Sequence, residues 1–266
     1  MFLEDELHAA YKLINSPILN FPFPHLYIEN IFSEKFYSEI QENLLDSNEM
    51  TSIASLNPEI PGLAIYKDRL VIDFNKKESI QKVTKGKQEF WTSFYEKMAP
   101  NLRNIFLAKF KNFLDMRFKY LKNVSYTDQL QLVCDKKNYS LGPHTDQPSK
   151  VVSLLIYLPK DCAQVSTGTS IYMPKDPSKL NLDLPHLHYK KEDFHKVITM
   201  PYAPNSAFCF IKTNNSFHGV EQLEMENVDR WSLQYNIHIT QDNVEQEIEA
   251  RDAYKKRKNP SSSQSE

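Results

Sequence analysis

The fold of this chain is decided by residues 230–240, which read RWSLQYNIHIT. Successive side chains of a β-strand point to opposite faces of a sheet, so a period of two identifies a strand with two different faces. One face carries Arg230, Ser232, Gln234, Asn236 and His238, and the other carries Trp231, Leu233, Tyr235, Ile237 and Ile239. The segment therefore predicts a strand with one polar and one apolar face.

From about residue 123 onward, the chain preceding this strand reads as short apolar runs separated by turn residues. The predicted strands are residues 129–134, 151–158, 169–173, 196–200, 207–211 and 217–222. Before residue 123, helical spacing dominates: Ser33 can cap a helix that runs to about Leu45, and apolar residues recur at i, i+3 and i+4 from Leu102 to Phe118. We expect a mainly β protein whose antiparallel sheet is closed or sandwiched and is supported on one face by N-terminal helices.

This composition shift also suggests how the chain is organised. We expect a single domain over residues 1–241, with a helical part up to about residue 122 and a β core from about 123 to 241. Residues 242–266 read as a charged helix with a disordered tail. The helix ends in the basic run Lys255–Lys258. Cations that neutralise a helix C-terminus explain this run more simply than a nuclear or nucleic-acid signal does.

Composition excludes several classes of protein. The 266 residues include 32 Lys and Arg against 34 Asp and Glu, a formal net charge of −2, which argues against nucleic-acid binding. The longest apolar stretch, residues 151–158, is too short to cross a membrane, and the first residues do not resemble a signal peptide. Cys134, Cys162 and Cys209 suit free thiols in a reducing cytoplasm. The five glycines are scattered and form no phosphate-binding loop. We expect a cytoplasmic globular protein.

A metal site is the strongest chemical signal. In an extended segment His144 and Asp146 point to the same face, because they are two residues apart. His218 lies in a second predicted strand and can supply a third ligand. Two neutral imidazoles and one carboxylate on one face of a metal form the facial triad of non-haem Fe(II) oxygenases, which leaves positions open for a cosubstrate and O₂.

An anion-binding residue follows the triad in the sequence. Arg230 begins the alternating strand, and Ser232 shares its face. A fixed guanidinium with a hydroxyl two residues further on suits the carboxylate at the end of a slender ligand. A metal triad and a carboxylate clamp together are far more specific than either feature alone.

With these residues in order, the sequence resembles the Fe(II)/2-oxoglutarate-dependent dioxygenases, and within them the prolyl-4-hydroxylase-like branch. The motifs that carry the resemblance are His144–Asp146, Val152–Leu158, Gly168-Thr169, Ser216–Val220 and Arg230–Ser232. Residues 21–30 also resemble the first strand of these oxygenases. The resemblance spans about Pro22 to Thr240.

The resemblance implies a double-stranded β-helix, or jelly-roll core, with the N-terminal helices packed on one sheet. It implies that His144, Asp146 and His218 bind Fe(II), that Arg230 pairs with the distal carboxylate of 2-oxoglutarate, and that the Tyr157 hydroxyl reaches the same carboxylate. The implied reaction couples oxidative decarboxylation of 2-oxoglutarate, which yields succinate and CO₂, to hydroxylation of a small-molecule or peptidyl substrate. O₂ is consumed, and ascorbate serves as an auxiliary reductant. Relatives often have a tyrosine at the position of Cys134. The sequence therefore departs from the family pattern at one residue that contacts the cosubstrate.

Other interpretations stay open. His144 and Asp146 alone could be a surface pair, and Tyr157 could be a core residue. His186, His188 and Glu192 resemble the first motif of the cupins, with His218 as the last ligand, so a metal-binding or sensing module without oxygenase activity is an alternative. The cupin glycines are missing, and residues 174–195 read as a loop over the mouth of the barrel. We expect that loop and residues 54–67 to influence specificity. An oxygenase scaffold kept as an interaction module is a third alternative.

Overall fold

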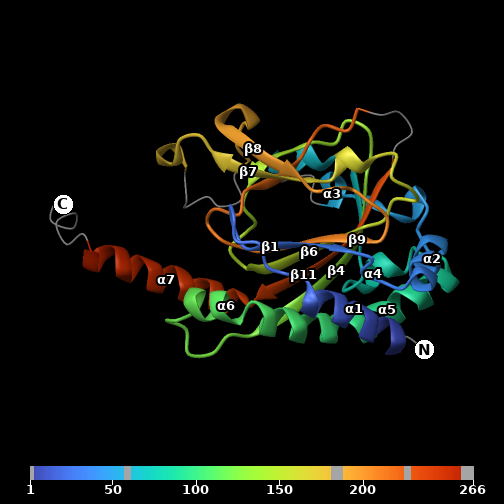
Figure 1. Ribbon diagram of the computed structural model, residues 1–266, viewed down its shortest axis with the longest axis horizontal. Coiled ribbons are helices and arrows are strands. Elements are labelled where there is room, and N and C mark those ends of the chain that lie inside the picture. Colours follow the sequence, from blue (N-terminus) through green and yellow to red (C-terminus); the bar gives the residue numbers. More distant parts are fainter. Residues whose placement is uncertain (1–2, 57–60, 181–187, 225–228, 259–266) are drawn as a thin grey trace.

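The computed structural model describes residues 3–56, 61–180, 188–224 and 229–258. The strands are β1 (His25–Glu29), β2 (Thr51–Ser52), β3 (Arg69–Asp73), β4 (Tyr126–Asp135), β5 (Leu141–His144), β6 (Lys150–Tyr157), β7 (Thr169–Pro174), β8 (Phe194–Thr199), β9 (Ser206–Ile211), β10 (His218–Val220) and β11 (Arg230–Ile239). They form two antiparallel sheets (Figure 1), a larger one in the order β1-β9-β6-β11-β4-β3-β2 and a smaller one in the order β5-β10-β7-β8. From β4 to β11 the chain passes repeatedly between the two sheets.

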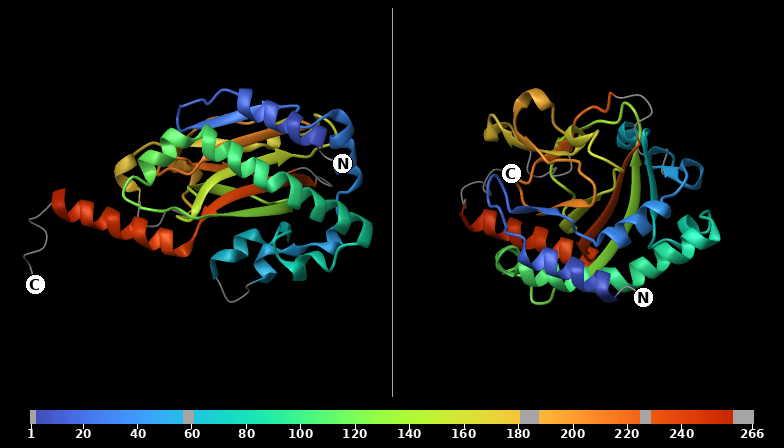
Figure 2. Two further views of the ribbon diagram at one scale, coloured as in Figure 1. Left: turned by 90° about the horizontal axis from the view of Figure 1, so that it is seen from below. Right: turned by 45° about the vertical axis from the view of Figure 1, so that its right-hand side comes forward.

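The helices lie mainly on one side of the larger sheet. The longer ones are α1 (Leu3–Asn15), α2 (Glu34–Glu42), α5 (Lys85–Lys109), α6 (Lys111–Arg117) and α7 (Gln241–Lys258). Short elements are α3 (Ile53–Leu56), α4 (Lys77–Ile80), η1 (Ser47–Glu49), η2 (Pro61–Tyr66), η3 (Val165–Thr167), η4 (Pro177–Lys179) and η5 (Lys191–Asp193). Figures 1 and 2 show α1 and α5 running alongside each other across the face of the larger sheet that is turned away from the smaller one.

The central strand β11 confirms the predicted alternation. Leu233, Tyr235 and Ile237 are fully buried and belong to the core that the sheet shares with the helices. On the opposite face, Ser232 and Gln234 line a cavity between the sheets. Strand β11 pairs with β4 along its whole length and with β6 on its other side, so its polar face forms part of the cavity wall.

The predicted helices also form, with one difference. The Ser33 hydroxyl accepts a hydrogen bond from the Phe36 amide at 3.2 Å and caps α2, as the sequence suggested. The amphipathic helix predicted over residues 102–118 is divided at Phe110 into α5 and α6, and α5 begins earlier, at Lys85. Its buried face includes Trp91 and Phe106, which pack under the sheet.

Strands also occur before residue 123. Strands β1 and β3 extend the larger sheet at its two sides, and β3 pairs with β4. The predicted strands from residue 129 onward all form, whereas β2, β3 and β5 were not predicted. The chain continues after β11 into the charged helix α7, as expected, and the predicted disordered tail lies outside the described residues. Within the part of the chain that the structure describes, no helix has both the length and the apolar character needed to span a bilayer.

Candidate metal centre

The three predicted ligands come together between the sheets. His144 ends β5, Asp146 follows two residues later, and His218 begins β10 directly opposite His144 in the antiparallel pair. One ligand atom from each residue lies within 4.8 Å of the other two, and all three side chains are buried. Among the described residues this is the one cluster of such groups that could hold a metal ion.

Backbone carbonyls orient both imidazoles. The Nδ1 atom of His144 lies 3.0 Å from the Gly142 carbonyl oxygen, and that of His218 lies 2.9 Å from the Ser216 carbonyl oxygen. When Nδ1 donates to these carbonyls, Nε2 keeps its lone pair for a metal. Burial lowers the pKa of both imidazoles, and the neighbouring His218 lowers that of His144 further. Both rings are therefore neutral at neutral pH, as ligation requires.

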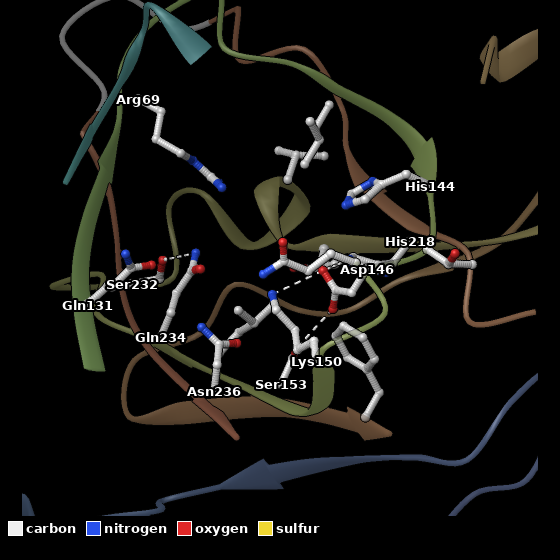
Figure 3. Close-up of a pocket in the computed structure, with 18 of the residues that line it drawn as sticks. Arg69, Gln131, His144, Asp146, Lys150, Ser153, His218, Ser232, Gln234 and Asn236 are labelled. Carbon is white, nitrogen blue, oxygen red and sulfur yellow. Dashed lines mark hydrogen bonds and ion pairs between the residues drawn. The ribbon is translucent and has the colours of Figure 1, made fainter. Parts of the chain in front are cut away.

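The Asp146 carboxylate is held by two side chains (Figure 3). Lys150 Nζ lies 3.0 Å from Oδ1, and the Ser153 hydroxyl donates to Oδ2 at 2.9 Å. Burial alone would raise the pKa of Asp146, but the charge of Lys150, and that of the two imidazoles once acid protonates them, outweighs burial and holds the pKa well below its usual range. The carboxylate is thus ionised and fixed in orientation. Hydrogen-bond partners of a metal ligand typically orient it in this way.

The triad opens onto a cavity of about 410 Å³. The wall that faces the triad is the polar face of the larger sheet, and Figure 3 shows Gln131, Ser232, Gln234 and Asn236 on it. Cross-strand pairing explains this grouping, because Gln131 is the partner of Gln234. A bound molecule would meet a metal site on one side and neutral hydrogen-bonding groups on the other.

Arg230 lies at the wall of this cavity, but its guanidinium is already engaged. Its Nη1 donates to Asp135 Oδ2 at 2.7 Å, and its Nε donates to the Thr167 carbonyl oxygen at 2.6 Å. Asp135 also accepts from Arg69, with Nε 2.6 Å from Oδ1 and Nη2 2.9 Å from Oδ2. Asp135 is the cross-strand partner of both arginines. Two guanidiniums share one carboxylate, so an excess positive charge remains at this end of the cavity.

The other two residues predicted to bind the cosubstrate lie beside Arg230. Ser232 lines the cavity and accepts a hydrogen bond from Gln234 Nε2 at 3.4 Å. The Tyr157 hydroxyl accepts from the Thr169 amide at 3.1 Å, and the Tyr157 ring lies 5.6 Å from Arg230 Cζ. Burial raises the pKa of Tyr157, which keeps its hydroxyl protonated.

The structure changes the interpretation of Cys134. Its side chain belongs to the core between the larger sheet and the helices, and the neighbouring Asp135 side chain pairs with the arginines at the cavity. Cys134 therefore does not occupy a cosubstrate contact. The residues that the sequence did not reveal are Asp135, Arg69, Lys150 and Ser153.

Within the described residues, the alternative cupin-type ligands do not assemble. His188 stacks on His144 with ring centroids 4.6 Å apart, and its Nε2 lies 3.2 Å from the Tyr66 hydroxyl. Glu192 is 73% exposed and pairs with Lys190, and His186 lies outside the described residues. His188 and Tyr66 both line the cavity, so the loops predicted to influence specificity do reach it.

Comparison with known proteins gives likenesses in structure only. No family model and no curated protein matches the chain. Among solved structures, the chain is similar to a 2OG-Fe(II) oxygenase family oxidoreductase from Burkholderia pseudomallei, at 11% identity and a TM-score of 0.43, covering 88% of this chain and 89% of that one. It is also similar to a prolyl-4-hydroxylase from Pseudomonas putida, at 10% identity and a TM-score of 0.47, covering 86% and 98%.

A third similar structure is HygX from Streptomyces hygroscopicus, solved with nickel, 2-oxoglutarate and hygromycin B, at 11% identity and a TM-score of 0.40, covering 82% and 83%. Likeness at this level carries no argument about chemistry, which has to come from the residues of the site itself.

Proposed function

We propose that this chain is a non-haem Fe(II) oxygenase that couples oxidative decarboxylation of 2-oxoglutarate to hydroxylation of a small-molecule or peptidyl substrate. The observation that carries the proposal is the buried cluster of His144, Asp146 and His218, with both imidazoles oriented through Nδ1. Two neutral imidazoles and one carboxylate are the donor set of this class of iron enzyme.

The residues present fit Fe(II). Both imidazoles are neutral and present Nε2, and the carboxylate is ionised, so no proton has to be displaced when the metal binds at neutral pH. His144, Asp146 and His218 would hold the ion, which when bound supplies the activation of O₂. The protein's part is to fix this geometry, to orient Asp146 through Lys150 and Ser153, and to exclude bulk water.

The charge at the Arg230 end supports 2-oxoglutarate as cosubstrate. The Arg69–Asp135–Arg230 group has two positive charges and one negative charge, and a further carboxylate would balance it. Arg69 Nη1 donates no hydrogen bond to any described residue, so it is available to an anion. Thr169 Oγ1, 3.5 Å from Arg230 Nη2, adds a hydroxyl at the same place. The distal carboxylate would bind here, with Ser232 and Tyr157 beside it.

The strand order supports a jelly-roll core. Counting from β4, the strands fall into two four-stranded sets, β4-β11-β6-β9 and β5-β10-β7-β8, each antiparallel throughout. This is the arrangement that a double-stranded β-helix requires, with β1, β2 and β3 added at the edges of the larger sheet. In such a core the triad lies on the smaller sheet and faces the interior, which is where a slender cosubstrate and O₂ would have to meet.

An anaerobic titration with Fe(II) and 2-oxoglutarate tests the proposal. Bidentate chelation of iron by the keto acid should produce a weak visible charge-transfer band. We expect His218→Ala to abolish the band and Arg230→Gln to weaken 2-oxoglutarate binding at least tenfold. Arg103→Gln, which removes a guanidinium of α5 that pairs with Asp128 of β4, should leave the band unchanged. Stoichiometric iron without a band in the folded protein would overturn the proposal.

A further inference from the structure

A second cavity, of about 530 Å³, lies outside the metal site. It is formed by the end of α6, by α7, and by the loops that follow β5 and β9. Figure 1 shows α6 and α7 side by side, and the ion pair between Arg117 and Glu247 joins them at 2.9 Å. The proposed oxygenase function assigns no role to this cavity.

Its unusual feature is a buried lysine. Lys212, the residue after β9, is only 7% exposed and lines the cavity. Its amide donates to the Val151 carbonyl oxygen, which fixes the backbone at this point. Its ammonium forms no hydrogen bond and no ion pair with any residue in the described part of the chain. An ammonium on so buried a side chain is costly, because it is largely desolvated and the two carboxylates that attract it, Glu247 and Asp146, form no ion pair with it.

The surroundings of Lys212 are positively charged. Among the described residues that line the cavity, three besides Lys212 are basic, Arg117, Lys119 and Arg251, and one is acidic, Glu247. Both oxygens of Glu247 accept hydrogen bonds from Arg117, at 2.9 Å each, so this carboxylate is already paired. Burial, followed by the charge of Arg117, lowers the pKa of Lys212 to about 8. The lysine still carries its proton at neutral pH.

The rest of the lining is largely apolar. Tyr120 and Leu121 follow α6, and Ile248 and Tyr254 come from α7. A ligand that matched both features would have an anionic group for Lys212 and an apolar body for these side chains.

We propose that this cavity is a second ligand site, which binds a small organic anion, a carboxylate or a phosphate attached to an apolar body, with Lys212 as its anchor. The site adjoins the metal centre from outside. Pro148 lines it, and the loop of Pro148 connects Asp146 with Lys150. The loop that begins with Lys212 leads to His218. A bound anion would therefore contact the loop that carries Asp146 and the loop that leads to His218.

Fluorescence titration of the full-length protein tests the site. The probe is dansylglycine, an aromatic carboxylate whose emission rises when it leaves water, and the uncharged dansylamide serves as the comparison. We expect saturable binding of dansylglycine that weakens at least tenfold in Lys212→Met, while dansylamide binds both proteins equally. Glu247→Gln removes the competing carboxylate and should tighten dansylglycine binding several-fold, which keeps the test open if Lys212→Met does not fold.

The matched control is Lys109→Met, which removes a partly buried lysine that donates to the Ile14 and Ser16 carbonyl oxygens and lines neither cavity. It should leave the affinity for dansylglycine unchanged. Non-saturable binding, equal affinity in Lys212→Met, or weakening in Lys109→Met alone would overturn the proposal. Competition by benzoate and by phenyl phosphate then shows whether a carboxylate or a phosphate is the better head group. The measurement needs neither iron nor turnover, so its outcome is independent of the proposed oxygenase activity.

Discussion

Asp135 and Arg230 form an ion pair in which both side chains are buried, with 2.7 Å between Oδ2 and Nη1 and exposed fractions of 0% and 2%. The same carboxylate accepts two hydrogen bonds from Arg69. The three residues lie in one row across β3, β4 and β11, because Asp135 is the direct partner of an arginine on each side. One carboxylate therefore positions both guanidiniums at the end of the cavity.

We expect Asp135→Asn to lower the free energy of unfolding by about 3 kcal/mol, because removing one member of a buried ion pair leaves uncompensated charge. Asp229→Asn is the matched control, since Asp229 is 44% exposed and pairs with Lys136 at the surface. Asp229→Asn should lower the free energy of unfolding by less than about 1 kcal/mol. Urea unfolding of both variants measures the difference, and equal losses would show that the row of charges does not stabilise the fold.

The Ser153 hydroxyl is expected to tune metal affinity. It donates to Asp146 Oδ2 at 2.9 Å, and partners of this kind typically contribute a factor of about 10 to 100 in affinity. We expect Ser153→Ala to weaken Co(II) binding about tenfold in a competition titration at pH 7.5. Ser206 is another buried serine, and its hydroxyl donates to the Ala203 carbonyl oxygen in the loop before β9, so Ser206→Ala should leave the affinity unchanged. If both variants bound Co(II) like the original protein, Ser153 would have no part in orienting the ligand.

His188 distinguishes the oxygenase triad from the cupin-type alternative. Because it stacks on His144 and reaches Tyr66, it supports a ligand without supplying one. We expect His188→Ala to retain one metal ion per chain, and His144→Ala to lose it. Metal content after desalting, measured by mass spectrometry, decides the matter. The reverse pattern would mean that the ligand set is the one containing His188.

Much of this architecture could be predicted from local patterns. The alternation in residues 230–239 predicts β11 and its two faces, and the spacing of His144 and Asp146 places both side chains on one face. Strand β5 was missed because its sequence, LGPH, contains glycine and proline, which are uncommon inside strands. Strand β3 is short and has a charged residue at each end, so its sequence contains no apolar run long enough to indicate a strand.

The residues that hold the site together could not be predicted, because their contacts depend on pairing between distant strands. Arg69 reaches Asp135 only through the register of β3 with β4. A shift of one residue reverses the face of a strand, so the position of the strand alone does not reveal that Cys134 faces the helices while Asp135 faces the cavity. Lys150 and Ser153 could have been suspected, since they lie four and seven residues after Asp146.

The buried Lys212 should lower the stability of the folded protein below pH 10.5. The pKa of Lys212 falls from 10.5 to about 8 on folding, so between these pH values the folded state binds fewer protons than the unfolded state, and the stability of the original protein gains a contribution as pH rises. Below pH 8 both states are protonated and the full penalty applies. We therefore expect Lys212→Met, without ligand, to raise the free energy of unfolding at pH 7 by roughly 3 kcal/mol.

This advantage of Lys212→Met should shrink through the same interval and be nearly absent above pH 10.5, the ordinary pKa of lysine. Urea unfolding of the variant and the original protein at each pH gives the difference, in which the titration of all other groups cancels. Lys160→Met, at an exposed position, should show no such trend. A gain that did not change with pH would mean that methionine packs better there, and that Lys212 carries no penalty for an anion to relieve.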